Sequence, residues 1–435
     1  MWKTKWKEVL AMRKKTRTRL LAGVTAICCV LPQMRAEAAE SLAGDVNADG
    51  TVSVADAVSL VRFLTHEAET IGSPQNADMN GDAKLNVSDL TLLKRLLLGK
   101  KQSVRSVYVT NTEELKAALA DAQAGDEIVL AEGTYVYSGS TAKGYMFQSG
   151  GEGTEEAPIR IHSENPEKPA VLSGSDIEHN FVFSIFGDWW IVEDLVLTTA
   201  QKGMILDNSN YSIIRNVEVC NLGSEGIHFR DDSSYCLAEN CYVHDTGLIS
   251  PGYGEAIYIG SAKNTTEYGH DCHYNTVRGC KLGPNVAAEH IDVKEYTIGT
   301  LIEDCIFDGK GMSGENYADS FVDIKGNDCV LRNCVGYRNG CEKINRAFES
   351  NQVVDGWGQN AFVYGNKAYM DTPTNAGGKK MYFLNCWDCT VTAWDNFIAY
   401  EDETLKSVDD PADKWSYYNC NMITYGDASY EEKLP

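Results

Sequence analysis

Two short segments of the chain each place a carboxylate two residues before a lysine. They are Asp292 with Lys294 and Asp323 with Lys325. Residues two apart in an extended strand point to the same face, so each acid and its amine would lie side by side on one surface. A carboxylate can bind a cation, and a lysine that has lost its proton can act as a base. The spacing therefore predicts proton abstraction next to a bound cation.

Both segments belong to a pattern of five residues that occurs six times. Its first residue advances along the chain by 23, 30, 34, 31 and 26 residues, and the copies are residues 203–207, 226–230, 256–260, 290–294, 321–325 and 347–351. From residue 203 to residue 325 the second and fourth positions are apolar, so we expect them to face a core and the other positions to face outward. A loose period of this length indicates the coils of a solenoid, joined by loops of varied length.

Stacked coils place equivalent residues about 4.8 Å apart, so each column of the alignment becomes a strip of surface. The third position reads Ile205, His228, Tyr258, Asp292, Asp323 and Glu349, the fifth reads Asp207, Arg230, Gly260, Lys294, Lys325 and Asn351, and three copies are preceded by Glu225, Glu255 and Glu289. We expect one outward patch, in which the candidate catalytic residues are Lys294, Lys325, Arg230 and His228 and the candidate substrate and calcium residues are Asp292, Asp323, Glu349, Glu289 and Glu255.

This patch predicts a specific reaction. Three stacked carboxylates repel one another unless they are protonated or bridged by a cation, which favours a calcium ion at the patch. Two lysines one coil apart would lower each other's proton affinity, which would suit one of them to act as a base. Together these groups favour β-elimination of a uronate polysaccharide, in which the cation neutralises the uronate, a lysine removes the C5 proton, and an Arg, His or Tyr assists.

A simpler alternative is that the alternating Asp and Lys residues form solvated ion pairs, each contributing less than about 1 kcal/mol. Against it, residues 249–255 and 309–319 next to the patch are long and rich in glycine. Loops of this kind often line functional sites.

Elements that would position the patch are also visible. Residues 107–135 read as strand, helix, turn and strand, and each later coil contains a turn at which Asn, Asp or Gly precedes Cys or Asn. We interpret the cysteines of this turn as a buried thiol stack, with disulfides or a metal site as alternatives: Cys241, Cys280, Cys305 and Cys334. The lone spacing of Cys386 and Cys389 has no matching set of histidines, which argues against zinc.

Most of residues 106–425 resemble the pectate-lyase-like β-helix of polysaccharide lyases, including the pectate lyases and the chondroitinase B and alginate lyase family. The resemblance implies a mainly β domain over residues 106–435, a right-handed parallel β-helix, with lyase activity on a plant cell-wall polysaccharide that contains uronate. One motif differs, because the second family has a Glu-x-Glu pair a few residues before its lysine, whereas Glu289 here lies three residues before Asp292 and five before Lys294.

A second set of chemical residues lies in residues 45–56 and 78–89, where oxygen-bearing side chains have the spacing of EF-hand-like calcium loops. The predicted ligand positions are Asp45, Asn47, Asp49, Thr51, Ser53 and Asp56 in the first loop and Asp78, Asn80, Asp82, Lys84, Asn86 and Asp89 in the second. Gly50 occupies the sharp turn of the first loop, and Ala83 takes that place in the second. Amphipathic runs at residues 57–64 and 90–98 predict a helix after each loop.

Two such units 33 residues apart resemble a type I dockerin over residues 43–99. The resemblance implies a small all-α module that binds two calcium ions and the cohesin domain of a scaffoldin. It also implies that Val54, Ala55, Val87 and Ser88, at loop positions 10 and 11, contribute to the choice of cohesin. A generic calcium-binding module is the alternative.

The first 38 residues run from a basic segment through an apolar one to a small-residue site at Ala36 and Ala38, the order found in a secretory signal peptide. The whole chain has 39 basic and 62 acidic residues, and removal of this segment would leave 30 basic and 60 acidic residues. The net charge of the remaining chain would be −30. We therefore expect a secreted, cellulosome-associated protein, with no binding to nucleic acid or membrane. Residues 100–105 would link its two domains.

Two other functions on the same β-helix remain open from the residues alone. A glycoside hydrolase could use the adjacent carboxylates Asp231 and Asp232 as acid and base. A carbohydrate-binding component without catalysis could hold its glycan through aromatic side chains, for which the candidates are Trp357, Tyr258, Trp387 and Trp394.

Overall fold

The structure is a computed structural model that describes residues 42–81, 84–99, 105–139, 144–401, 404–409 and 416–434. Contacts divide the chain into two units, Met1–Lys101 and Gln102–Pro435. The expected signal peptide, most of the expected linker, and Asp82 and Ala83 of the second loop lie outside the described residues. No helix among the described residues is long and apolar enough to span a membrane.

Among its described residues, the first unit contains three short helices, α2 (Val54–Leu64), α3 (Pro74–Ala77) and α4 (Val87–Gly99). The helix predicted after each loop is present, and both start three residues earlier than the amphipathic pattern because the last loop residues form the first turn. Ser53 caps α2, and Asp56 completes a capping box by accepting a hydrogen bond from the Ser53 backbone. A small core forms where Leu60 of α2 and Leu93 of α4 are both buried.

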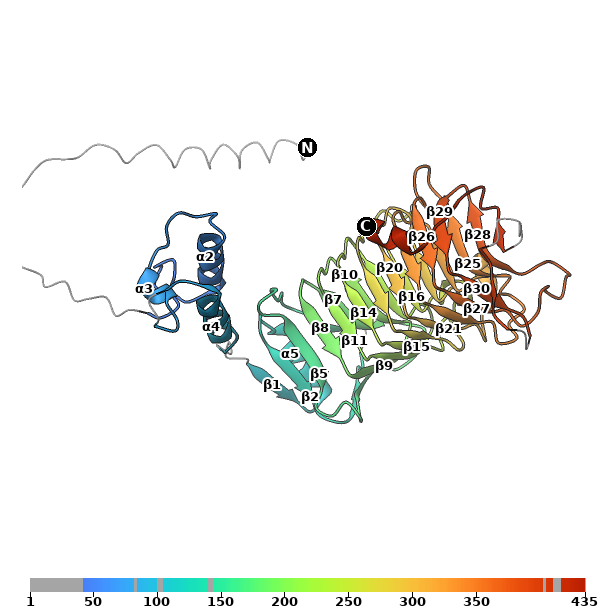
Figure 1. Cartoon of the computed structure of the whole chain (residues 1–435). Coiled ribbons are helices and arrows are strands. Elements are labelled where there is room, and N and C mark those ends of the chain that lie inside the picture. Colours follow the sequence, from blue (N-terminus) through green and yellow to red (C-terminus); the bar gives the residue numbers. More distant parts are fainter. Residues whose placement is uncertain are drawn as a thin grey trace, which may run out of the picture. The chain divides into compact units, whose positions relative to one another are not determined.

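In its described residues, the second unit consists of three sheets whose strands are parallel, apart from one antiparallel pair at the end, and a complete coil contributes one strand to each sheet (Figure 1). The twelve-stranded sheet contains β1 (Ser106–Val109), β2 (Glu127–Leu130), β5 (Ile159–Ser163), β8 (Trp190–Glu193), β11 (Ile213–Arg215), β14 (Leu237–Glu239), β17 (Thr276–Arg278), β20 (Leu301–Glu303), β23 (Val330–Arg332), β26 (Ala361–Tyr364), β29 (Thr390–Trp394) and β33 (Met422–Tyr425). The ten-stranded sheet contains β4 (Tyr145–Gln148), β7 (Phe181–Phe186), β10 (Lys202–Asp207), β13 (Ile227–Arg230), β16 (Ile257–Ile259), β19 (Ile291–Val293), β22 (Val322–Ile324), β25 (Arg346–Asn351), β28 (Tyr382–Trp387) and β32 (Tyr417–Tyr418). The eleven-stranded sheet contains β3 (Thr134–Val136), β6 (Ala170–Ser173), β9 (Leu195–Ala200), β12 (Glu218–Leu222), β15 (Tyr242–His244), β18 (Lys281–Leu282), β21 (Ile306–Asp308), β24 (Val335–Tyr337), β27 (Lys367–Tyr369), β30 (Phe397–Ala399) and β31 (Lys406–Ser407).

This architecture is the predicted right-handed parallel β-helix. Its first coil is covered by α5 (Thr112–Ala120), whose Leu115 and Leu119 are fully buried in the core. The helix covers apolar surface that the open end of the coil would otherwise expose to water. The segment from β1 to β3 contains the predicted strand and helix, and the predicted turn and strand are followed by one strand more, so that β2 and β3 both come after the helix.

The six-copy alignment is confirmed residue by residue in the ten-stranded sheet. Asp292 is the register partner of Tyr258 on one side and of Asp323 on the other, and Asp323 pairs in turn with Glu349. The same column continues to Asn385 of β28. Because side chains alternate between the two faces of a strand, this register fixes which side chains face outward together.

The turn that joins the twelve-stranded to the eleven-stranded sheet explains the second sequence column. Its residues have left-handed backbones, and the φ angles are 53° at Asn240, 63° at Gly279, 56° at Asp304, 55° at Asn333, 68° at Gly365 and 53° at Asp395. Glycine tolerates this conformation, and Asn and Asp visit it more readily than other residues.

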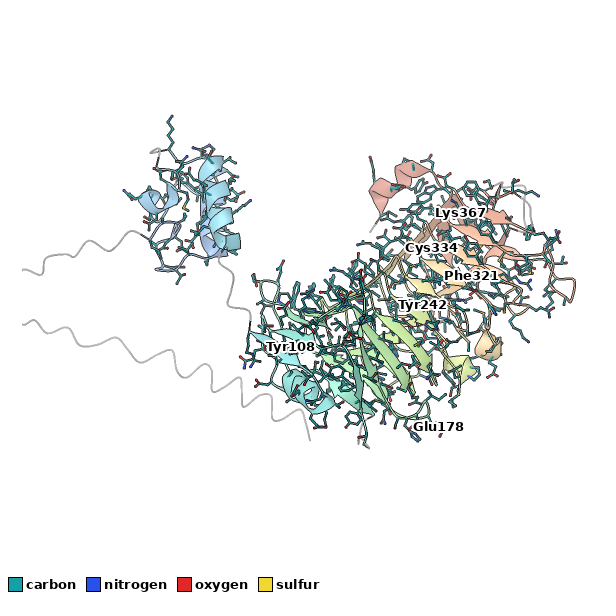
Figure 2. The ribbon with its side chains drawn as sticks, turned by 90° about the horizontal axis from the view of Figure 1, so that it is seen from below. Tyr108, Glu178, Tyr242, Phe321, Cys334 and Lys367 are labelled. Carbon is teal, nitrogen blue, oxygen red and sulfur yellow. A yellow bond between two sulfur atoms is a disulfide. The ribbon has the colours of Figure 1, made fainter. Side chains whose placement is uncertain are left out.

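The residue after each turn points into the core. Cys241, Cys280, Cys305 and Cys334 are free and buried there, as predicted for a thiol stack, and Figure 2 labels Cys334 and the core residue Phe321. Asn366 then continues the stack by accepting a hydrogen bond from the backbone of Cys334 at 2.9 Å. One disulfide, Cys386 to Cys420, occurs among the described residues, outside this stack.

Candidate functional site

Two neighbouring pockets open on the outward face of the ten-stranded sheet. We call the larger, of about 420 Å³, the Trp387 pocket, and it is lined by Glu289, Asp292, Lys294, Asn316, Tyr317, Asp319, Asp323, Lys325, Arg346, Glu349, Asn351 and Trp387. We call the smaller, of about 360 Å³, the Arg230 pocket, and it is lined by Lys202, Glu225, His228, Arg230, Tyr253, Glu255, Tyr258, Ser261, Ala262, Thr265, Glu267, Tyr268, Lys294 and Asn316. Lys294 and Asn316 line both pockets and therefore lie at their junction.

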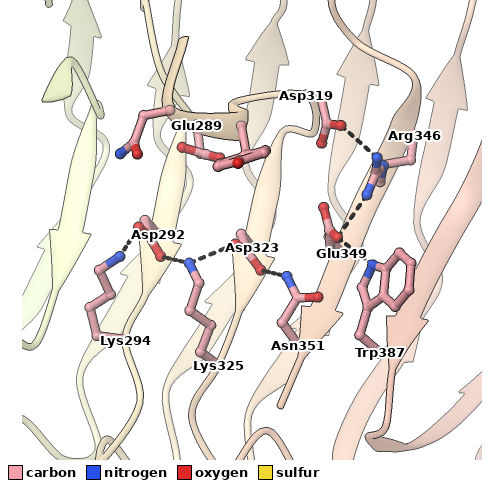
Figure 3. Close-up of a pocket in the computed structure, with 12 residues that line it drawn as sticks. Glu289, Asp292, Lys294, Asp319, Asp323, Lys325, Arg346, Glu349, Asn351 and Trp387 are labelled. Carbon is pink, nitrogen blue, oxygen red and sulfur yellow. Dashed lines mark hydrogen bonds and ion pairs between the residues drawn. The ribbon is translucent and has the colours of Figure 1, made fainter. Parts of the chain in front are cut away.

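The predicted patch is thus brought together, and its acids and lysines alternate (Figure 3). Asp292 lies 2.7 Å from the ammonium of Lys294 and 2.6 Å from that of Lys325, which also lies 2.6 Å from Asp323. Burial opposes the ionisation of Asp292, but the two ammonium groups outweigh burial and lower its pKa.

The predicted effect of one lysine on the other is wrong for Lys325. Burial alone would lower the pKa of Lys325, but the carboxylates of Asp292 and Asp323 outweigh burial and raise that pKa well above its ordinary value. The prediction considered only the repulsion between Lys294 and Lys325, whereas the carboxylate of Asp292 lies between them. Lys325 is therefore held as a cation in this arrangement.

Glu349 does not join Asp292 and Asp323 around a shared cation, as the stacked-carboxylate argument expected. Arg346 lies 2.7 Å from Glu349 and 2.5 Å from Asp319, and Trp387 donates its indole N–H to Glu349 at 3.0 Å (Figure 3). Burial first, and then the charge of Asp323, raises the pKa of Glu349 to about 7. The side chains of the protein thus supply the counter-charges at this end of the patch.

A cluster of three carboxylates that includes Asp292 does fit a cation. Glu255, Glu289 and Asp292 each bring one oxygen within 4.8 Å of the other two. Glu255 and Glu289 are buried, and within the described residues no other side chain forms a hydrogen bond or ion pair with either. Burial and then Glu225 raise the pKa of Glu255 to about 8, and burial and then Asp292 raise that of Glu289. Clustered oxygen ligands, of which Glu255 and Glu289 are without side-chain partners in the described residues, suit a hard cation such as Ca²⁺.

The Arg230 pocket contains fixed cationic and aromatic groups. The guanidinium of Arg230 donates two hydrogen bonds to Asp207, at 2.6 and 2.7 Å, and lies 3.7 Å from the ring centre of Tyr268. Lys202 pairs with Glu225 at the edge of the same pocket. These contacts hold positive charge on the wall of the pocket without leaving it unpaired.

His228 and Tyr258 lie between Arg230 and Lys294. His228 Nε2 lies 2.9 Å from the Gly260 carbonyl and its Nδ1 lies 3.4 Å from Glu225, while burial lowers the pKa of the imidazole. The Tyr258 ring lies edge-on to His228 and 5.0 Å from the ammonium of Lys294. Burial and then Asp292 raise the pKa of Tyr258 well above its ordinary value, so its phenol stays protonated.

Two loops meet above the junction of the pockets. The short helices η1 (Pro251–Tyr253) and η2 (Glu315–Tyr317) contact each other, and Asn316 donates a hydrogen bond to the Gly252 carbonyl at 3.0 Å. Asn316 and Tyr317 have φ angles of 55° and 68°, and the Tyr317 side chain is left 91% exposed. Left-handed backbone at residues other than glycine costs energy and is frequent at functional sites.

The sequence analysis missed several residues of the pockets, although a signal for two of them was present. Lys202 and Arg346 precede the first and last copies of the repeat, in the same column as Glu225, Glu255 and Glu289. Reading that column to both ends would have found them. The flagged glycine-rich segments do contribute Tyr253, Asn316 and Tyr317, but no pattern singles out these side chains.

The residues considered for a hydrolase are engaged elsewhere. Asp231 accepts a hydrogen bond from the backbone of Gly269 at 2.7 Å, and Asp232 accepts one from the backbone of Asp271 at 2.8 Å. Neither aspartate lines the two pockets. Of the aromatic residues considered for glycan binding, Trp387 and Tyr258 line the pockets, whereas Trp394 is buried against Tyr364.

Comparisons with known proteins bear on the two domains of the chain. The family model of the dockerin type I domain matches residues 43–98, so the chain carries a type I dockerin. The solved structure of an alginate lyase from Paenibacillus sp. str. FPU-7 is 39% identical in sequence, with 74% of this chain and 98% of that chain covered and a TM-score of 0.64. A rhamnogalacturonan lyase structure shares only the fold, at 13% identity, 75% and 88% coverage and a TM-score of 0.51. No curated protein matches the chain.

The fold and the 39% identical relative together show a polysaccharide lyase. Within that class, the chain belongs to the family of the Paenibacillus alginate lyase, which its β-helix matches over nearly the whole length of that protein.

Proposed function

We propose that the protein is a secreted, cellulosomal lyase that cleaves a uronate polysaccharide of the alginate type by β-elimination, with Lys294 as the base. The observation that carries the proposal is that Lys294 lies where the two pockets meet. A chain that occupies both pockets would then have a glycosidic bond next to this ammonium. The name of the 39% identical relative supports alginate over the plant polysaccharide expected from the sequence.

The reaction assigns a separate role to each group at the junction. Lys294, once its ammonium has lost a proton, accepts the C5 proton, the electrons of that C–H bond form the C4–C5 double bond, and the C4–O4 bond breaks. Tyr258, with its phenol protonated, donates a proton to the departing O4. Lys325 stays a cation between two aspartates and contributes a fixed positive charge rather than a base.

Arg230 and His228, the other predicted catalytic residues, act on the substrate from the Arg230 pocket. Arg230 presents a positive wall to uronate carboxylates, which an acidic protein needs in order to hold an acidic chain. His228 is buried against the Gly260 carbonyl and Tyr258, so we assign it the positioning of the Tyr258 ring.

A calcium ion would be held by Glu255, Glu289 and Asp292, with Asp323 and Glu349 of the original expectation on the wall of the Trp387 pocket. When bound, such an ion neutralises the carboxylate of the sugar and acidifies its C5 proton.

The dockerin would bind two further calcium ions and a cohesin domain. In the first loop Asp45 accepts hydrogen bonds from the backbones of Asp49 and Gly50, and Asp56 accepts them from Asn47 and Ser53, so acidic side chains close the loop from both ends. Asp89 of the second loop is buried and accepts a hydrogen bond from Met79 at 2.9 Å. The proposed cohesin contacts are all exposed: Val54, Ala55, Val87 and Ser88.

One assay tests the proposed reaction. The protein is incubated with alginate, polygalacturonate and a neutral glucan, with calcium or with chelator, and the ultraviolet absorbance of unsaturated ends is followed. We expect absorbance with alginate and none with the glucan. New reducing ends without absorbance would overturn the β-elimination, and activity confined to polygalacturonate would overturn the substrate.

A further inference from the structure

A second group of metal-ligand side chains lies away from the pockets, on the eleven-stranded sheet. Glu218 and Cys220 are two residues apart on β12 and share one face of that strand, and Cys220 is the register partner of His244 on β15. One ligand atom from each of the three, a carboxylate oxygen, Sγ and an imidazole nitrogen, lies within 4.8 Å of the other two. Tyr242, labelled in Figure 2, marks β15.

A fourth residue orients the imidazole. His244 Nδ1 lies 2.6 Å from Asp245, and its Nε2 lies 3.3 Å from Glu218. A carboxylate on one ring nitrogen fixes the tautomer and directs the other nitrogen toward a metal, an arrangement that metal-bound histidines commonly have. The pair with Asp245 therefore directs Nε2 toward Glu218 and Cys220, where it can bind a metal.

Cys220 differs from the other free cysteines of the described residues. All of them are buried in the coil except Cys220, which is partly exposed on the outer face. Its Sγ lies 3.7 Å from the hydroxyl of Thr198 on the preceding strand β9. A thiol on the surface, next to an imidazole and a carboxylate, is available to a metal ion in a way that the stacked thiols are not.

We propose that Glu218, Cys220 and His244 bind a zinc ion, with Asp245 as the residue that orients His244. Sulfur, imidazole and carboxylate are the ligand types of Zn²⁺, and three protein ligands leave one position for water. Ca²⁺ prefers oxygen ligands alone. Zinc would therefore bind at this site, and calcium would bind at the carboxylates of the pockets.

The spacing of cysteines along the chain could not reveal this site. Cys220 and His244 lie one coil apart, 24 residues along the sequence, and meet only because β12 pairs with β15. The zinc ion would join two successive coils on a sheet that does not line the pockets, so its role is structural. An ordinary alternative is that a protonated His244 only bridges its two carboxylates.

Cobalt separates the two possibilities, because Co²⁺ replaces zinc and gives a thiolate-to-metal absorption band only when sulfur is bound. The full chain, reduced and saturated with calcium to fill the dockerin loops, is titrated with Co²⁺ and then with Zn²⁺. We expect a thiolate band that saturates at one ion per chain and disappears when zinc is added. Absence of the band would overturn the proposal.

Variants identify the ligands. Cys220→Ser should remove the band, His244→Gln should weaken binding, and Asp245→Asn should weaken it by about 10- to 100-fold. His179→Gln is the matched control, because His179 also pairs with a carboxylate, Asp176 at 3.0 Å, but belongs to no cluster of metal-ligand side chains in the described residues, and it should leave the band unchanged.

Lyase activity, which should be normal in every variant, shows that each variant is folded. A band that persists in Cys220→Ser would overturn the assignment. If Cys220→Ser is inactive, zinc protection of the Cys220 thiol against alkylation in the unmodified chain is measured instead, and failure of zinc to protect it would also refute the site.

Discussion

Two faces of the same coil carry stacked charges, and they differ in how completely those charges are paired. On the twelve-stranded sheet, arginines and glutamates alternate from Glu127 to Arg332, and every inner member has a partner on each side. On the ten-stranded sheet, Lys325 is similarly enclosed, but Glu255 and Glu289 have no such partner and Lys294 lies at the end of the series.

The difference is also one of exposure and shape. The arginine side chains of the first series are 30–43% exposed, so water screens them and each pair contributes little. Asp292 and Lys325 are buried, and the Trp387 pocket opens beside them. The same fold thus carries a fully paired series of charges, the arginine strip, on the twelve-stranded sheet and an incompletely paired series on the ten-stranded sheet. A substrate or a cation can add its charge to the incompletely paired series.

The largest expected effect is on Lys294. Lys294→Ala should lower kcat by about 100-fold or more, because removal of a positioned base costs roughly 10²- to 10⁴-fold. The rate of formation of unsaturated ends is the measurement, and the midpoint of thermal unfolding serves as the control for folding. Activity within a few-fold of the original would move the base to another residue.

The next effect is on stability and concerns Lys325. Lys325→Met leaves Asp292 without one of its two cations and Asp323 without its ammonium partner, so we expect a loss of about 3–5 kcal/mol in the free energy of unfolding of the β-helix. Denaturant unfolding followed by tryptophan fluorescence measures it. A loss below about 1 kcal/mol would mean that the series on this face is as weakly coupled as the arginine strip.

A smaller effect is expected from Tyr317. A sugar ring lying on its exposed face would bury on the order of 50 Å² of apolar surface, which stabilises binding by about 1.3 kcal/mol. Tyr317→Ala should therefore raise KM about tenfold with kcat nearly unchanged. Tyr337→Ala is a control, because Tyr337 is exposed on β24 of the eleven-stranded sheet and stacks on Tyr369. An equal rise in KM in the control would refute a specific role.

Much of this organisation could be predicted from the residues, because stacking in a β-helix depends on a period of two within the strand and on turn residues that tolerate a left-handed backbone. Both are local, and they gave the register around Asp292 and the cysteine stack. Ion pairing is not local. Whether Lys325 bends toward Asp292, or Glu349 toward Arg346, depends on rotamers and burial that no spacing encodes.

Non-local contacts also explain why the positions of the loops next to the patch could be predicted from the sequence but their contacts could not. Glycine content marks residues 309–319 as a flexible connection, whereas the hydrogen bond from Asn316 to Gly252 depends on a loop more than 60 residues earlier. A contact between loops of different coils follows from the shapes of both loops, and neither shape is fixed by a repeat.

The smallest effect should come from the arginine strip itself, and it completes the comparison. Arg278→Ala removes partners of Glu239 and Glu303, but Glu239 keeps Arg215 at 2.8 Å and Glu303 keeps Arg332 at 2.5 Å. Because Arg278 is 43% exposed, we expect a loss of less than about 1 kcal/mol in the free energy of unfolding and no change in activity. Burial is the main difference between Arg278 and Lys325. A loss as large as that of Lys325→Met would therefore show that ion pairing between successive coils affects stability more than burial does.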